Sequence, residues 1–329
     1  MGFISELFGY LLNWLYDIFN NYGIAIILFS IILRIILIPI TIKQQTTMKK
    51  SAKLQGKMAE IQKKYKNNPE KLNQETIELY KSEKMSPFSG CLSSILQLVI
   101  ILAVFWLVSQ PLTYMKKINP EIIEKYTQIV QTEGTTRSGY AQIGVIQYAE
   151  TKFQEVEKEL TDITNQLEQE NIANREELEI RKGELEAQKE EYNQLRLNMD
   201  FLGIDLSKVP TQSLNDWRVY IIPVLYVITS FVSIKLTTAV QTKNNKKKEV
   251  IIQENENEPS EPDPMEQMQA MNKNMTYMMP IMSVAIAIIA PLGLALYWLI
   301  SNILMIIERL IINKVMEKRE EEEEESTNA

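Results

Sequence analysis

Apolar and strongly charged stretches alternate along the 329 residues of this chain. Five apolar stretches approach or reach the length of a membrane-spanning helix, for which about 20 apolar residues suffice. They lie at residues 23–42, 87–112, 217–240, 276–291 and 292–312. The pattern therefore predicts an all-α integral membrane protein with five transmembrane helices.

Residues 1–22 predict a further helix that does not cross the membrane. Apolar side chains such as Phe3, Leu7 and Leu11 recur at helical spacing, and Trp14 suits the boundary between lipid and water. We expect an amphipathic helix that lies on the membrane surface.

The segment 43–86 is strongly basic. Between residues 43 and 84 there are eleven lysines and five glutamates, and a short lysine-rich loop beside a membrane span belongs in the cytoplasm. Asn68 and Pro69 suit an N-cap and the first position of a new helix, so the segment predicts a cytoplasmic helical hairpin. Its lysines could form only a solvated face, or they could contact RNA phosphates or anionic lipid.

The polar segment 113–216 is expected on the opposite, extracytoplasmic side, with 12 basic and 20 acidic side chains. Apolar residues at heptad-like spacing over 153–167 and 178–199 predict an antiparallel coiled-coil hairpin, and a single broken helix is the alternative. Asp205 and Asp216 are expected to lie in water without a further role.

Alternation of the spans places the N-terminus outside and the C-terminus in the cytoplasm. The cytoplasmic loop 241–275 contains a stretch, 249–266, whose composition is typical of a disordered linker. The cytoplasmic tail 313–329 ends in a run of glutamates, and we expect it to be acidic and disordered.

One arginine, Arg34, lies in the middle of the first predicted span. A charge at that depth costs roughly 2.5–3.5 kcal/mol on insertion scales. Lys43, where the apolar stretch ends, is about 13 Å away along the helix axis, which disfavours snorkelling to the headgroups. Gln97 is a second polar group at membrane depth. Both favour a polar, water-containing cavity inside a helix bundle.

Composition limits the chemistry that the chain can perform. It has no histidine and a single cysteine, Cys91, which excludes the usual His/Cys zinc sites, intramolecular disulfides and Ser-His-Asp or Cys-His catalytic groups. No glycine-rich phosphate-binding loop is found. We therefore expect neither enzyme activity nor a cofactor.

Several short motifs follow one another in a specific order. They are Gly23-Ile24-Ala25-Ile26 with Arg34 and Pro39, Lys43-Gln44 with Met48, Leu54-Gln55 with Ile61-Gln62-Lys63-Lys64-Tyr65, Leu79-Tyr80-Lys81, Pro87 with Gly90-Cys91-Leu92, Gln97, Phe201-Leu202-Gly203-Ile204-Asp205-Leu206, Met279-Pro280, and Tyr297-Trp298 with Ser301-Asn302. In this order they resemble the YidC, Oxa and Albino membrane protein insertases, over residues 22–115 and 200–312.

The resemblance implies a hydrophilic groove that is open to the cytoplasm and to lipid and closed on the outside. Such a groove takes up polar tails or loops of nascent membrane proteins and releases their helices laterally into lipid, alone or with the Sec translocon. The residues expected to line or support it are Arg34, Gln97, Tyr297, Trp298 and Asn302. For the last four, interhelical hydrogen bonding or aromatic anchoring is the alternative.

The resemblance also implies partners. The hairpin lysines Lys57, Lys63, Lys64 and Lys66 are expected to meet the ribosome or the arriving client protein. The other expected partners are the lipid bilayer, the Sec translocon and the signal recognition pathway, with no DNA, in the plasma membrane of a bacterium.

Three features depart from the family pattern. Residues 116–199 form a larger insertion than we expect, Glu308 stands where a glutamine is usual, and the tail is acidic where a basic, ribosome-docking tail is common. Two other functions were weighed. A transporter with Arg34 in its substrate path would predict internal repeats, and no convincing repeat is found. A non-catalytic envelope adaptor or assembly chaperone could act through the coiled coil.

Overall fold

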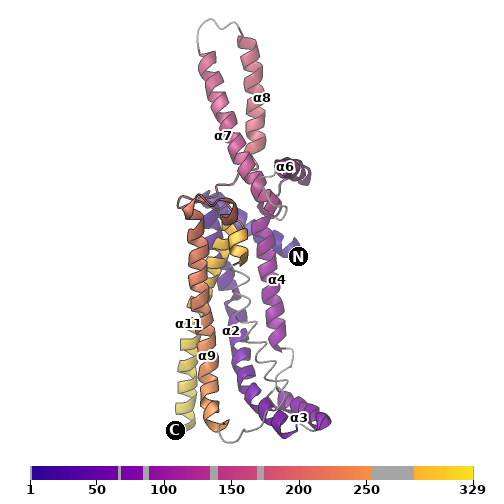
Figure 1. Ribbon diagram of the computed structural model, residues 1–329, viewed down its shortest axis with the longest axis vertical. Helices are drawn as coiled ribbons and strands as arrows, with labels where there is room; N and C mark the ends of the chain where they lie inside the picture. The colour runs from indigo at the N-terminus through magenta and orange to yellow at the C-terminus, as the bar shows by residue number, and fades with distance from the viewer. Residues whose placement is uncertain are drawn as a thin grey trace. The chain divides into compact units, whose positions relative to one another are not determined.

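The computed structural model is mostly helical (Figure 1) and describes residues 2–65, 68–83, 89–133, 140–168, 174–252 and 285–328. The elements are α1 (Gly2–Phe19), α2 (Tyr22–Lys64), α3 (Pro69–Ser82), α4 (Ser89–Ser109), α5 (Pro111–Tyr114), α6 (Pro120–Thr132), α7 (Ala141–Leu167), α8 (Arg175–Asn193), β1 (Asp200–Phe201), β2 (Ile204–Asp205), η2 (Pro210–Gln212), η3 (Trp217–Tyr220), α9 (Ile221–Ile252) and α11 (Leu292–Asn328). They form two compact units. One comprises residues 1–29, 101–223 and 287–297, and the other comprises residues 30–100, 224–286 and 298–329.

Three helical stretches among the described residues are long and apolar enough to cross a membrane. They are Tyr22–Thr47, Trp217–Leu236 and Leu292–Val315, and they match the first, third and fifth predicted spans. The second predicted span contains α4, of which Leu98–Ser109 is a shorter apolar helix. Most of the fourth predicted span lies outside the described residues, so the count of five spans stays a prediction.

In the first unit, α7 and α8 form a helical hairpin (Figure 1). Val156 and Ile163 of α7 pack with Leu185 of α8 in a buried apolar cluster, at positions that the heptad-like spacing indicates. Ion pairs join Glu157 to Lys189 and Glu159 to Arg181. Because the partner number falls as the α7 number rises, the two helices are antiparallel. The supercoil of a true coiled coil stays a prediction.

The base of this hairpin is held by aromatic and charged contacts. The rings of Tyr126, Tyr148 and Tyr192 lie 6.0–6.3 Å apart, centroid to centroid, and link α6, α7 and α8. The Arg196 guanidinium donates two hydrogen bonds to the Glu150 carboxylate, at 2.6 and 3.1 Å. These contacts fix the hairpin to the rest of its unit without using the hairpin tip.

Helix α1 contacts protein along one face and leaves a second apolar face exposed. On the contact face, the Ser5 hydroxyl donates to the Ala103 carbonyl at 3.0 Å, and Gly9 lies against the backbone of Tyr114. Phe3 and Trp14 are 80% and 58% exposed. The helix is therefore apolar on more than one side, and its position on the membrane surface stays a prediction.

The chain that follows α8 joins the starts of α2 and α11 within the first unit. The backbone N–H of Tyr22 donates to the Asn198 carbonyl at 2.9 Å, and that of Gly293 donates to the Leu206 carbonyl at 2.8 Å. The Phe201 ring packs so closely on Gly23 that an added Cβ would lie 2.5 Å from it. The first N–H groups of a helix have no partner within it, and these contacts satisfy two of them.

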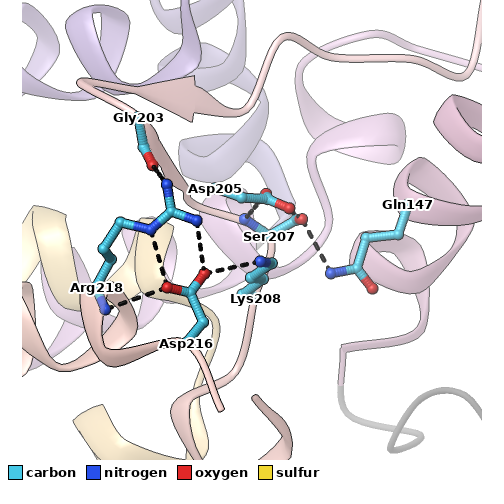
Figure 2. A network of polar contacts seen from close by, with 7 residues as sticks. All are labelled: Gln147, Gly203, Asp205, Ser207, Lys208, Asp216 and Arg218. Atoms are coloured by element: carbon cyan, nitrogen blue, oxygen red, sulfur yellow. Dashed lines mark hydrogen bonds and ion pairs between the residues drawn. The ribbon is translucent and has the colours of Figure 1, made fainter. Parts of the chain in front are cut away.

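Asp216 is the centre of an ion-pair network in the loop between α8 and α9 (Figure 2). Its carboxylate accepts hydrogen bonds from the Arg218 guanidinium at 2.9 and 3.2 Å and from the Lys208 ammonium at 3.0 Å. Arg218 also donates to the Gly203 carbonyl at 3.1 Å. The Arg218 and Lys208 hydrogen bonds hold the pKa of Asp216 well below its usual range.

Asp205 belongs to a neighbouring hydrogen-bond chain. It accepts from the backbone N–H and the hydroxyl of Ser207, and that hydroxyl accepts from the Gln147 side chain at 2.9 Å (Figure 2). The expectation that Asp205 and Asp216 merely lie in water was therefore wrong. Both carboxylates order the loop between the hairpin and α9, and sequence periodicity carries no signal for such contacts.

In the second unit, α2 runs without a break from the predicted span into the predicted hairpin. It contains Pro39, whose missing N–H removes one hydrogen bond of the helix. The predicted start of α3 is confirmed, because the Asn68 side chain accepts from the Lys71 N–H at 3.1 Å and Pro69 is the first helical residue. The Tyr65 hydroxyl donates to the Glu75 carboxylate of α3 at 3.0 Å.

The helices α9 and α11 both extend beyond the predicted spans. Residues 249–252 of the predicted linker belong to α9, and the rest of that linker lies outside the described residues. The acidic tail is helical as far as Asn328, so the expectation of a disordered tail was wrong. Glutamate, lysine and arginine have high helix propensity and can extend a helix that the membrane span has already started.

Gly9 offers a test of the contact between α1 and α5. An added Cβ at Gly9 would lie 1.9 Å from the Tyr114 carbonyl oxygen, so Gly9→Ala should destabilise the protein by about 1–3 kcal/mol, the usual cost of overpacking. Thermal unfolding in detergent measures this. Gly183→Ala is the matched control, because nothing lies within 4 Å of its added Cβ in the middle of α8. It should stabilise by about 0.5–1 kcal/mol; equal effects would contradict the close contact.

The Asp216 network should make stability depend on pH. The lowered pKa of Asp216 means that its contribution is complete above the ordinary aspartate pKa of about 3.9 and is lost as the pH falls further. Asp216→Asn should therefore lower the unfolding temperature at pH 7, and the difference from wild type should shrink below pH ~4. Asp162→Asn, at an exposed site on α7 without an ion pair in the described residues, is the control. A difference that does not change with pH would rule out the ionic explanation.

Candidate functional site

Arg34 of α2 forms a buried ion pair with Glu308 of α11 in the second unit. The Arg34 Nε atom lies 2.5 Å from the Glu308 Oε2 atom, and the two side chains are 18% and 7% exposed. Arg34 is near the middle of the candidate span Tyr22–Thr47, and Glu308 lies seven residues before the end of the candidate span Leu292–Val315. Both charges are therefore carried by segments suited to a membrane, where an unpaired charge is most costly.

The pair leaves hydrogen-bonding capacity unused. Arg34 Nε and both Glu308 carboxylate oxygens are buried, and none makes an aligned hydrogen bond within the described part of the chain. The short contact is therefore electrostatic and is not a well-formed hydrogen bond. Arg309 is close enough to interact electrostatically with both Arg34 and Glu308.

The sequence predicts a polar cavity around Arg34 and does not name Glu308 as its partner. Glu308 stood out only as a departure from the family pattern. The available signal was a carboxylate within the apolar run 292–312 and an arginine within the first apolar run. Ionisable residues in membrane spans usually pair with one another, and that rule would have joined them.

The side of α11 that carries Trp298 and Asn302 faces α9. The Asn302 amide donates to the Ser230 hydroxyl at 3.1 Å and to the Thr229 hydroxyl at 3.3 Å, and the Trp298 ring packs on the Tyr226 ring at 6.1 Å. Asn302 thus makes the interhelical hydrogen bonds that were the alternative to groove lining. Residues six apart lie about 120° apart around a helix, so Glu308 faces a different direction.

The remaining predicted site residues are less informative. Tyr297 is buried, at 7% exposed, and belongs to the first unit, so the structure does not assemble it with Arg34. The side chain of Gln97 lies outside the described residues. Their groove roles stay predictions.

Of the four hairpin lysines predicted to contact partners, Lys57 and Lys64 have described side chains, and both are exposed. Lys57 forms an ion pair with Glu83 at 2.5 Å and lowers the pKa of that carboxyl group, and the Lys64 ammonium lies 5.2 Å from the Tyr65 ring centroid. The side chains of Lys63 and Lys66 lie outside the described residues. Lys57 is therefore partly neutralised, whereas Lys64 is exposed.

The chemistry of this site is limited to charge, hydrogen bonding and apolar contact. Among the described residues, no group of three acidic, histidine or cysteine side chains could hold a metal ion. What the site offers is a largely buried ion pair between two candidate membrane spans. Beside it, α2, α9 and α11 carry exposed apolar side chains, among them Ile36, Phe231 and Ile311.

Comparison with known proteins gives a consistent result. The family model described as 60Kd inner membrane protein matches residues 14–320. The chain is 42% identical over 105 residues to the membrane protein insertase YidC of Caldanaerobacter subterraneus, which is 32% of this chain and 51% of that protein. The YidC proteins of Fusobacterium nucleatum and Clostridium perfringens are 40% and 43% identical over 102 and 108 residues, or 31% and 32% of this chain and 50% and 42% of theirs. The matches thus span about half of the relatives' length or less.

Proposed function

Because the chain belongs to the 60Kd inner membrane protein family, with the YidC proteins, we propose that it is a membrane protein insertase of a bacterial plasma membrane. It takes polar tails or loops of nascent membrane proteins into a hydrophilic groove and releases their helices laterally into lipid. The observation that carries this proposal is the buried charge of Arg34 in the middle of a candidate span.

The groove begins at the ion-pair site. Arg34 attracts acidic residues of the client's polar tail, and this attraction is strong because charges at membrane depth are weakly screened. The unused hydrogen-bonding capacity of Arg34 and Glu308 supports a site that holds water or a polar chain segment. The site thereby lowers the barrier for moving a polar segment into the membrane.

The driving force for insertion comes from the client. Burial of its helix in lipid contributes roughly 25 cal/mol per Å² of apolar surface, so no nucleotide is needed. The exposed apolar side chains of α2, α9 and α11 suit helices that face lipid and a path by which the client leaves sideways.

The groove is closed on the outside, as in the family that the chain resembles. Within the first unit, the loop between α8 and α9 is held by its backbone hydrogen bonds to the starts of α2 and α11 and by the Asp216 network. We propose that the N-terminus lies outside and the C-terminus in the cytoplasm, and that α1 lies on the outer membrane surface.

The cytoplasmic hairpin meets the ribosome or the arriving client. Exposed Lys64 supports contact with phosphates, and Lys57, Lys63 and Lys66 are assigned the same role. The acidic tail does not suit docking to ribosomal RNA, because like charges repel. The protein acts alone or beside the Sec translocon and the signal recognition pathway.

The first test is co-translational insertion of a two-span client with an acidic N-terminal tail into liposomes that contain only this protein. Arg34→Ala alone would remove the ion-pair partner of the buried Glu308 carboxylate and destabilise the site, which would confuse a loss of stability with a loss of function. Arg34→Ala combined with Glu308→Gln removes both charges and should reduce insertion about tenfold, which equals ~1.4 kcal/mol. Arg34→Lys keeps the charge and should retain most activity. Protease protection of the tail measures the result.

The outcomes of this test are distinct. If the wild type and the doubly substituted protein insert the client equally well, the insertase function stands and Arg34 has no role in its mechanism. Absence of insertion by the wild-type protein would overturn the proposed function.

The extracytoplasmic hairpin is expected to be dispensable for insertion. Deleting residues 158–188 and joining Glu157 to Lys189 by a Gly-Ser linker keeps the tyrosine cluster and the Arg196–Glu150 pair at the base. The truncated protein should insert the client at the wild-type rate, because no groove residue is altered. A correctly folded truncation that loses insertion would favour the adaptor function.

A further inference from the structure

Glu308 occupies the position at Arg34 that a client carboxylate would need. It is a carboxylate 2.5 Å from the Arg34 guanidinium, both side chains are largely buried, and each carries buried polar atoms without an aligned hydrogen bond. Because Arg34 Nε and the two Glu308 carboxylate oxygens make no aligned hydrogen bond within the described residues, exchanging the Glu308 carboxylate for another breaks none at these three atoms.

We propose that Glu308 is an internal competitor that determines how acidic a client tail must be before it is accepted. In the resting protein Glu308 neutralises Arg34, and a client tail enters by displacing the Glu308 carboxylate from the guanidinium. This inference rests on the proposed function and assigns to that site a selectivity residue.

The surrounding charges explain why displacement is feasible. Arg309, the next residue on α11, interacts electrostatically with both members of the pair. A displaced Glu308 carboxylate therefore stays near a positive charge and is not left isolated in an apolar medium.

The competition has a quantitative consequence. A tail with one carboxylate exchanges one ion pair for a similar one and gains little, whereas a tail with several acidic residues presents a higher local concentration of competing carboxylates. The wild-type protein should therefore discriminate between tails with one and three aspartates more strongly than a protein whose Arg34 is unopposed.

The test is insertion of three otherwise identical clients, with zero, one or three aspartates in the N-terminal tail, into liposomes that contain wild type or Glu308→Gln. Glutamine keeps the size and polarity of the side chain and removes its charge. Glu308→Gln should raise insertion of the one-aspartate client about tenfold, which equals ~1.4 kcal/mol, and should reduce the ratio of three-aspartate to one-aspartate insertion. Glu179→Gln is the matched control, since Glu179 forms an exposed ion pair with Arg175 on α8.

A second measurement tests the ion pair itself without reference to insertion. Arg34→Glu should lower the unfolding temperature, because two carboxylates then face each other. Adding Glu308→Arg to the same protein restores an opposite-charge pair and should recover much of the loss. Absence of recovery would show that the two side chains do not pair.

The results separate the inference from the function on which it rests. If wild type inserts the three-aspartate client and Glu308→Gln does not improve the one-aspartate client, the competition is overturned and the insertase function stands. If wild type inserts none of the clients, the proposed function is overturned and the inference with it.

Discussion

The cost of placing charge in an apolar medium is the constraint on which the second unit depends. Arg34 lies near the middle of one candidate span, and Glu308 lies in another. Removing a partner from a buried ion pair costs about 3–5 kcal/mol, so the pair joins α2 to α11. It also defines the rotation of α11, because a helix that turns Glu308 toward α2 directs Asn302 and Trp298 elsewhere. These two residues contact α9.

A different constraint applies in the first unit. Backbone N–H groups at the starts of its helices need hydrogen-bond acceptors, and its loop carboxylates need donors. The N–H groups of Tyr22 and Gly293 find carbonyl partners in the chain that follows α8. Asp216 accepts from Arg218 and Lys208 in the same loop. Several short contacts therefore hold this loop of the first unit, whereas a largely buried ion pair joins α2 and α11 in the second.

Local sequence features were sufficient where a local cause determines the structure. The Asn68 cap and Pro69 start of α3 were predicted because capping depends on neighbouring residues. Apolar run length likewise located the candidate spans at Tyr22–Thr47 and Leu292–Val315. Arg34 was recognised as a polar site because its cost is evident from its position alone.

Two kinds of feature were not predicted from the sequence. One is a contact between residues that are distant in sequence, and the other is a segment whose structure depends on the residues before it. The pairing of Glu308 with Arg34 was not predicted, because an apolar stretch shows where a charge is costly but not which charges meet. Asp205 and Asp216 were expected to lie in water because the hydrogen bonds that they accept come from Ser207 and Lys208, in a loop without sequence periodicity. The acidic tail was expected to be disordered on composition, but a helix that has already formed lowers the cost of extending into it.

A buried ion pair is seldom the most stable solution, since well-packed apolar residues of similar volume often stabilise a protein equally or better. The pair of Arg34 and Glu308 is also imperfectly hydrogen-bonded, which reduces its value for stability further. Stability alone is thus a weak reason for two opposite charges in segments suited to a membrane. The proposed client site, which is polar when a client arrives and neutral enough to persist when none is present, would account for both charges and for the loose geometry between them.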